Sequence, residues 1–153
     1  MFGLFNRKKK QLEQMASNIC TMLNVIFWPL RKMNDDDLPS GFETDKFLLG
    51  YIYGVIVAGG FVYGLKKPVD KGMLTVSVFE MFFPSIGMDI ASNCTTWANE
   101  NNEGFCNGMD LGMDESSIVY KAMMTGDENA VKNTVGALQS LEKHLHENYD
   151  KAP

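Results

Sequence analysis

The chain begins with an apolar stripe that has helical spacing. Along this segment apolar residues recur at intervals of three and four, so they fall on one face of a helix: Leu12, Met15, Ile19, Leu23 and Ile26. Pro29 interrupts the pattern, because proline lacks an N–H donor and its ring clashes with the preceding helical turn. The pattern therefore predicts an amphipathic helix that ends near Pro29.

Residues 47–65 are apolar on every side and would be long enough to cross a bilayer. The segment is rich in glycine and tyrosine, however, which insert less favourably than Leu or Ile. Its glycines Gly50, Gly54, Gly60 and Gly64 lie within an arc of roughly 120° on a helix. We therefore predict a buried central helix, whose glycine stripe faces either a helix of the same chain or, in a homo-oligomer, a second copy.

The other segments also favour helices. Ser40 and Glu43 have capping-box spacing, which predicts that the central helix runs from about Glu43 to Lys66. Residues 73–83 alternate like a strand but also share a helical face, and we interpret them as helix because no second strand is evident. Three further helices are predicted. The first runs from Pro84 to about Ala98, with Ile86, Ile90 and Trp97 on its inner side, and the second from Asp114 to Gly126. The third begins at Asp127 and has an apolar seam made of Val131, Val135, Leu138, Leu141 and Leu145.

These elements predict an all-α, single-domain bundle of about five to six helices around the central Gly-rich helix. Its 153 residues, 45% apolar and 22% charged, suit one domain over residues 1–153. We expect a basic and apolar arm at residues 1–10 and a polar loop at residues 99–113. The three cysteines lack CxxC spacing, and no secretory signal is evident, so we expect a cytoplasmic protein.

Charge is unevenly distributed along the chain. The net charge is −5, with +3 on residues 1–71 and −8 on the remainder. An acidic half that repels phosphates argues against nucleic acid as a partner. In the arm, Phe2, Leu4 and Phe5 precede the cations Arg7 to Lys10, a combination that would suit a membrane surface. We expect instead that the arm's apolar residues fold back onto the bundle.

Metal-binding and catalytic motifs are weak, and no cofactor is predicted. The residues Asn99, Asn101, Glu103, Asn107 and Asp110 overlay loosely on a calcium-binding loop, but only two of them are acidic. His144 and His146 are two residues apart and point to different sides of a helix. Cys106, in the predicted polar loop, is the candidate reactive thiol. No catalytic residue is assigned.

Methionine and phenylalanine are abundant and provide adaptable apolar surface. We predict a non-catalytic binding protein that recognises a protein partner or an apolar ligand through a Met/Phe-rich face or an acidic surface. The candidate face consists of Met81, Phe82, Phe83, Met123 and Met124. The alternatives are a peripheral membrane protein that uses the arm, a small enzyme that uses Cys106 and, last, a calcium-responsive domain.

Overall fold

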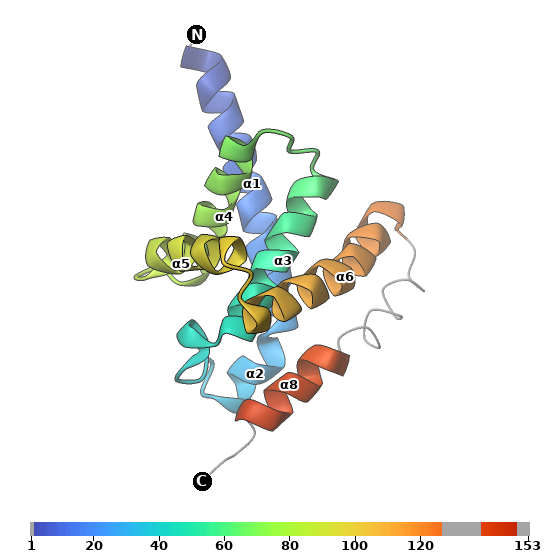
Figure 1. Cartoon of the computed structure of the whole chain (residues 1–153). Helices are drawn as coiled ribbons and strands as arrows, with labels where there is room; N and C mark the ends of the chain where they lie inside the picture. Colours follow the sequence, from blue (N-terminus) through green and yellow to red (C-terminus); the bar gives the residue numbers. More distant parts are fainter. Residues whose placement is uncertain (1, 127–138, 150–153) are drawn as a thin grey trace.

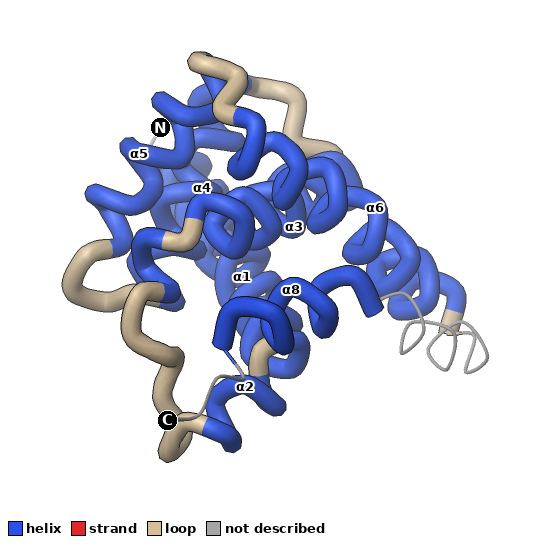
Figure 2. The backbone as a smooth tube through the Cα atoms, turned by 60° about the horizontal axis from the view of Figure 1, so that its bottom comes forward, coloured by secondary structure: helices blue, strands red, loops and turns tan. Residues whose placement is uncertain are grey.

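The computed structural model describes residues 2–126 and 139–149, which are mostly helical (Figure 1). The elements, in chain order, are α1 (Phe2–Ile26), α2 (Trp28–Met33), the short 3-10 helix η1 (Phe42–Thr44), α3 (Lys46–Val62), α4 (Pro68–Phe82), α5 (Gly87–Asn99), α6 (Glu103–Thr125) and α8 (Gln139–Tyr149). The described residues contain no strand, as Figure 2 shows by colour. The prediction of an all-α bundle is confirmed.

Helix α3 is the central element of the bundle. It packs against α1, α4, α5 and α6, and most of its residues are buried. A helix that is apolar on all sides is stable in this position because its neighbours cover every face. The predicted central helix is thus confirmed. Among helices in the described part of the chain, none is long and apolar enough to span a membrane.

Two glycine stripes hold α3 and α6 in close contact. A Cβ atom added at any of four glycines would collide with a carbonyl oxygen of the other helix: Gly50 with Phe105, Gly54 with Met109, Gly108 with Phe47 and Gly112 with Tyr51. The residue numbers of the contacts rise together, so the helices run parallel, as Figure 1 also shows. At Gly50 and Gly54 the predicted stripe therefore packs against a helix of the same chain, α6.

Buried polar contacts fix the register of this helix pair. The Tyr51 hydroxyl donates a hydrogen bond to Glu115 Oε2 at 2.8 Å, and the Tyr120 hydroxyl lies 3.3 Å from the Val55 carbonyl oxygen that accepts its bond. A Cβ at Gly59 would lie only 2.6 Å from the Tyr120 oxygen, so this glycine makes room for the tyrosine. Because buried polar groups need partners, sliding either helix would be costly.

The polar loop expected at residues 99–113 is mostly helix, and this prediction was wrong. Helix α5 ends at Asn99 and α6 begins at Glu103, which leaves residues 100–102 as the connection. The Asn102 side chain accepts a hydrogen bond from the Phe105 N–H at 3.2 Å and caps α6. Asp114 lies inside α6 rather than at the start of a separate helix. Gly126, with a φ of 64°, ends the helix as predicted.

Two other predicted helix starts were wrong. Asp45, and not Ser40, caps α3: its carboxylate accepts the Leu48 N–H at 3.1 Å. Pro84 lies before α5, which starts at Gly87, and Ile86 is exposed rather than inward. The ambiguous segment 73–83 is helical, as predicted, apart from Phe83, which caps the end of α4.

The arm does not fold back onto the bundle. Residues 3–11 are all exposed, and α1 continues straight through them and projects beyond its neighbours (Figure 1). The side chains of Leu4 and Phe5 are 78% and 72% exposed. The expectation that these apolar residues are buried was therefore wrong. Burial along α1 begins only at Leu12.

Helix α8 is attached to the start of α3. Tyr149 donates a hydrogen bond to Asp45 Oδ2 at 2.7 Å, His144 Nε2 lies 3.1 Å from the same oxygen, and the His144 ring stacks on Phe47. Leu141 is buried and Leu145 packs against the core, as the predicted seam requires. The other seam residues, Val131, Val135 and Leu138, lie outside the described residues.

Candidate binding cavity between α3, α4 and α5

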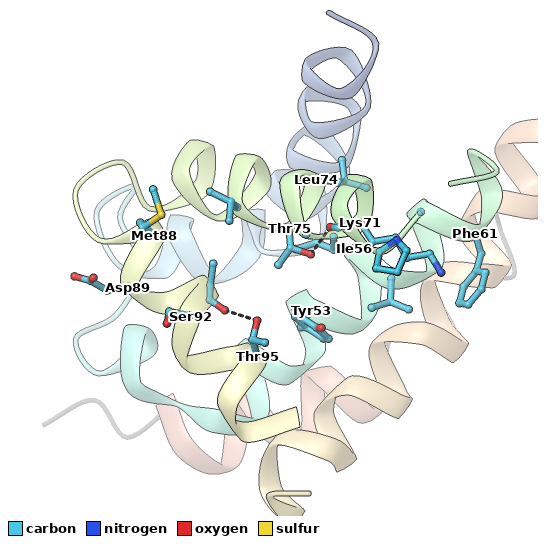
Figure 3. Close-up of a pocket in the computed structure, with 16 residues that line it drawn as sticks. Tyr53, Ile56, Phe61, Lys71, Leu74, Thr75, Met88, Asp89, Ser92 and Thr95 are labelled. Carbon is cyan, nitrogen blue, oxygen red and sulfur yellow. Dashed lines mark hydrogen bonds between the residues drawn. The ribbon is translucent and has the colours of Figure 1, made fainter. Parts of the chain in front are cut away.

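A cavity of about 690 Å³ lies between α3, α4 and α5 (Figure 3). Its walls are mainly aliphatic and aromatic, and each helix contributes part of them. The apolar lining includes Ile56, Val57 and Phe61 from α3, Pro68, Leu74 and Val76 from α4, and Met88 and Ala91 from α5. The space is partly open to solvent, since Phe61 and Met88 are exposed, and its apolar walls can cover part of an apolar molecule.

Two glycines in the walls help to leave this space open. A Cβ at Gly60 would have Leu74 Cδ2, at 3.9 Å, as its nearest neighbour, and a Cβ at Gly72 would meet nothing within 4 Å. Neither glycine is needed for close backbone approach, unlike Gly50 and Gly54. A Cβ at Gly60, which lines the cavity, would therefore displace no backbone.

Six of the sixteen residues that line the cavity are polar or charged: Tyr53, Lys71, Thr75, Asp89, Ser92 and Thr95 (Figure 3). The hydroxyls of Thr75 and Thr95 donate hydrogen bonds at 2.9 Å and 3.0 Å to the carbonyl oxygens of Lys71 and Ala91 in their own helices. They therefore remain available to a ligand only as acceptors. Lys71 can donate to a ligand, and its ammonium lies 4.9 Å from the centre of the Phe61 ring.

Tyr53 supplies a second donor in the cavity wall. Burial raises the pKa of its hydroxyl, and the nearby Cys94 raises it further. The phenol therefore stays protonated at neutral pH and can donate a hydrogen bond. The arrangement can bind an apolar body and orient it by hydrogen bonds to Tyr53 and Lys71.

The five residues of the predicted Met/Phe-rich face do not come together. Phe82 and Phe83 are buried in the core, whereas Met81, Met123 and Met124 are exposed. Figures 1 and 2 both place α4 and the end of α6 on opposite sides of α3. Met81 is thus separated from the two methionines of α6.

Cys106 lies in the first turns of α6, not in a loop, and is partly exposed. The other two cysteines are buried, and burial raises the pKa of Cys20 to about 11 and that of Cys94 to about 12. These two thiols therefore stay neutral and act as small apolar groups.

The residues of the loose calcium-loop resemblance lie mainly along a helix. Asn99 ends α5 and Asn101 is in the connection, while Glu103, Asn107 and Asp110 are on α6. The helical rise spreads these last three over about 10 Å, so they cannot wrap around one ion as loop ligands do. Within the described residues, no group of three or more His, Cys, Asp or Glu side chains is placed to hold a metal ion.

The search of protein-family models, of curated proteins and of solved structures found no match to this chain.

Sequence reasoning did not find the cavity. Its lining comes from three helices, and a void leaves no periodic signal in any one of them. Gly60 belongs to the predicted glycine stripe, and its position beside the cavity follows from how α4 and α5 pack against α3. The one available signal in the sequence is Gly60 itself, a glycine on a buried helix with no corresponding row of small residues on another helix.

Proposed function

We propose that this protein is a non-catalytic binding protein that holds an apolar ligand in the cavity between α3, α4 and α5. The observation that carries the proposal is the cavity itself, with about 690 Å³ of space behind mainly apolar walls. Small-molecule sites commonly have about 300 to 1,000 Å³, apolar walls and few polar groups. The cavity has the volume and the mainly apolar walls of such a site.

The polar groups support a ligand with an apolar body and at least one hydrogen-bond acceptor. Tyr53 and Lys71 are donors, Asp89 and Ser92 add a carboxyl and a hydroxyl group on the α5 side, and the donors of Thr75 and Thr95 are already used within their helices. An acceptor on the ligand would be matched by these donors, and an apolar body would contact the aliphatic walls.

Recognition of a protein partner is the other form of binding that the sequence suggested. The packing gives it less support, because Phe82 and Phe83 belong to the core and Met81 is separated from Met123 and Met124. A protein partner would therefore use an acidic surface or the two α6 methionines alone.

Replacing Gly60 by leucine tests the cavity. The new side chain fills the space without a backbone clash and removes a glycine from a helix interior, so stability should be kept or increased. Binding of the neutral apolar dye N-phenylnaphthylamine, followed by its fluorescence, should weaken by at least about tenfold because the volume is lost. Gly104→Leu is the matched control, since Gly104 is exposed on α6, outside the cavity.

Thermal unfolding of all three proteins must accompany the dye titration. Weaker dye binding in Gly60→Leu, with an unchanged or higher melting temperature and with normal binding in Gly104→Leu, supports the proposal. Equal dye binding in the wild type and in Gly60→Leu would place the apolar site elsewhere on the molecule.

A further inference from the structure

One end of the molecule is strongly basic although the chain as a whole is acidic. This end, which we call the basic end, consists of residues 2–10 and 61–73. It contains seven cations and one acid, Asp70, which give it a charge of +6. Because the whole chain has a charge of −5, the remainder has a charge of −11.

The fold brings these two segments together. Lys8 of α1 forms an ion pair of 2.8 Å with Asp70 in the first turn of α4. The Lys71 ammonium lies over the Phe61 ring and so joins α4 to the end of α3. Figure 1 shows the start of α1 and the α3–α4 connection at the same end of the molecule.

The basic end also exposes large apolar side chains. In addition to Leu4 and Phe5, Phe61 is 61% exposed and Val69 is 64% exposed. On a helix Phe5 points within roughly 20° of Leu12, so the core-facing stripe of α1 continues past the bundle without a partner among the described residues. Exposed apolar groups of this size, surrounded by cations, indicate an interaction surface.

We propose that the basic end docks on the surface of an anionic lipid bilayer. The cations would lie at the anionic headgroups, where each contributes about 1 kcal/mol, while Leu4 and Phe5 insert among the upper acyl chains. This inference does not require that the cavity bind a ligand.

The distribution of charge favours a bilayer over nucleic acid. A membrane is a plane that only the basic end needs to touch, so the body with its charge of −11 stays on the water side. A nucleic acid extends past the contact and would meet that acidic surface. Aliphatic side chains such as Leu4 and Val69 also have a function in lipid that they lack on a phosphate backbone.

Vesicle flotation with the full chain tests the electrostatic part. Wild-type protein should bind vesicles made of equal parts phosphatidylcholine and phosphatidylglycerol, less so at high salt, and should not bind pure phosphatidylcholine. The double variant Lys66→Gln/Lys67→Gln should bind about 30-fold more weakly, from about 1 kcal/mol for each lysine. The control Lys32→Gln/Lys143→Gln removes the same charge from α2 and α8, at the other end (Figure 1), and should bind normally.

The apolar part needs a separate pair of variants. Leu4→Ser/Phe5→Ser should weaken binding to the mixed vesicles by at least about tenfold. Trp28→Ser/Met33→Ser alters two exposed apolar residues of α2 and should leave binding unchanged. All four positions are exposed, so circular dichroism spectra should match those of the wild type.

Three outcomes would overturn the proposal: equal binding to neutral and anionic vesicles, equal loss in the control variants, or no binding to either vesicle type. Tighter binding to a DNA duplex than to the vesicles, with no effect of Leu4→Ser/Phe5→Ser, would assign the basic end to nucleic acid. A dimer that dissociates in Leu4→Ser/Phe5→Ser, detected by light scattering without lipid, would assign it to a second copy.

Discussion

Asp45 joins two helices through one carboxylate. One oxygen caps α3 through the Leu48 N–H, and the other accepts the Tyr149 hydroxyl of α8 and lies beside His144. Burial alone would raise the pKa of Asp45. The hydrogen bonds from Tyr149, Leu48 and His144, and the charge of His144, act in the other direction, and the net effect is a lowered pKa.

The lowered pKa of Asp45 predicts a pH-dependent contribution to stability. A carboxyl whose folded pKa lies below its unfolded value, about 4, stabilises the fold fully above that value and loses the contribution as pH falls through the folded pKa. Asp45→Asn keeps a capping side chain but loses the charge. We expect it to lower the free energy of unfolding by about 1 to 2 kcal/mol at neutral pH, and much less near pH 2.

Urea unfolding at both pH values measures this difference. Asp114→Asn is the control, because Asp114 is exposed on α6 and an exposed charge contributes little at either pH. If the free energies of unfolding of wild type and Asp45→Asn differ by the same amount at both pH values, the carboxylate charge does not hold α8.

At the level of elements, the parallel pair α3 and α6 organises the bundle. Its four interface glycines let the two backbones approach closely, and each of these glycines faces a carbonyl oxygen of the other helix. Close approach increases dispersion contacts along both helices and offsets the low helix propensity of glycine.

Alanine substitution should have opposite effects at two helical glycines. In Gly54→Ala the new Cβ meets the Met109 carbonyl, the helices must move apart, and we expect a loss of about 3 kcal/mol in the free energy of unfolding. In Gly72→Ala on α4 the Cβ meets nothing within 4 Å, and we expect a gain of about 0.5 to 1 kcal/mol. Urea unfolding of both variants measures whether each substitution lowers or raises the free energy of unfolding. Similar effects at both positions would mean that the α3–α6 contact is not tight.

Glycine content also explains why some helices could be predicted from the sequence and others could not. Helix α1 was predictable because its apolar residues mark one face by themselves. The start of α6 was not, because Gly104, Gly108 and the surrounding asparagines have low helix propensity and are typical of loops. Packing of Gly108 and Gly112 on α3 stabilises the helix there, and this tertiary contribution is absent from a local pattern.

At the scale of the whole molecule, the candidate site was less predictable than the fold. The cavity depends on how far α4 and α5 stand from α3, which no single segment encodes. The basic end was partly predictable, since the composition of residues 2–10 already suggested a membrane surface. The contribution of Lys66, Lys67 and Phe61 required the fold, because those residues are distant from the arm in sequence.

The three cysteines allow opening of the whole bundle to be followed in the native protein. Cys106 is partly exposed, while Cys20 and Cys94 are buried in the core with raised thiol pKa values. Since only the thiolate reacts, a disulfide reagent at neutral pH should label Cys106 quickly and the other two only after the core opens. We therefore expect one fast phase and a slow phase of twice its size, and denaturant should merge the two.

Cys94 also connects this measurement to the cavity. It lies on α5 beside Tyr53, which lines the cavity, so a ligand bound there should stabilise the closed bundle and slow the labelling of Cys94. Saturating N-phenylnaphthylamine should lower the slow rate and leave the fast rate of Cys106 unchanged, and Gly60→Leu should remove this protection. Fast labelling of all three thiols without denaturant would contradict the tightly packed core, and equal slowing of Cys106 would indicate that the dye binds near that thiol.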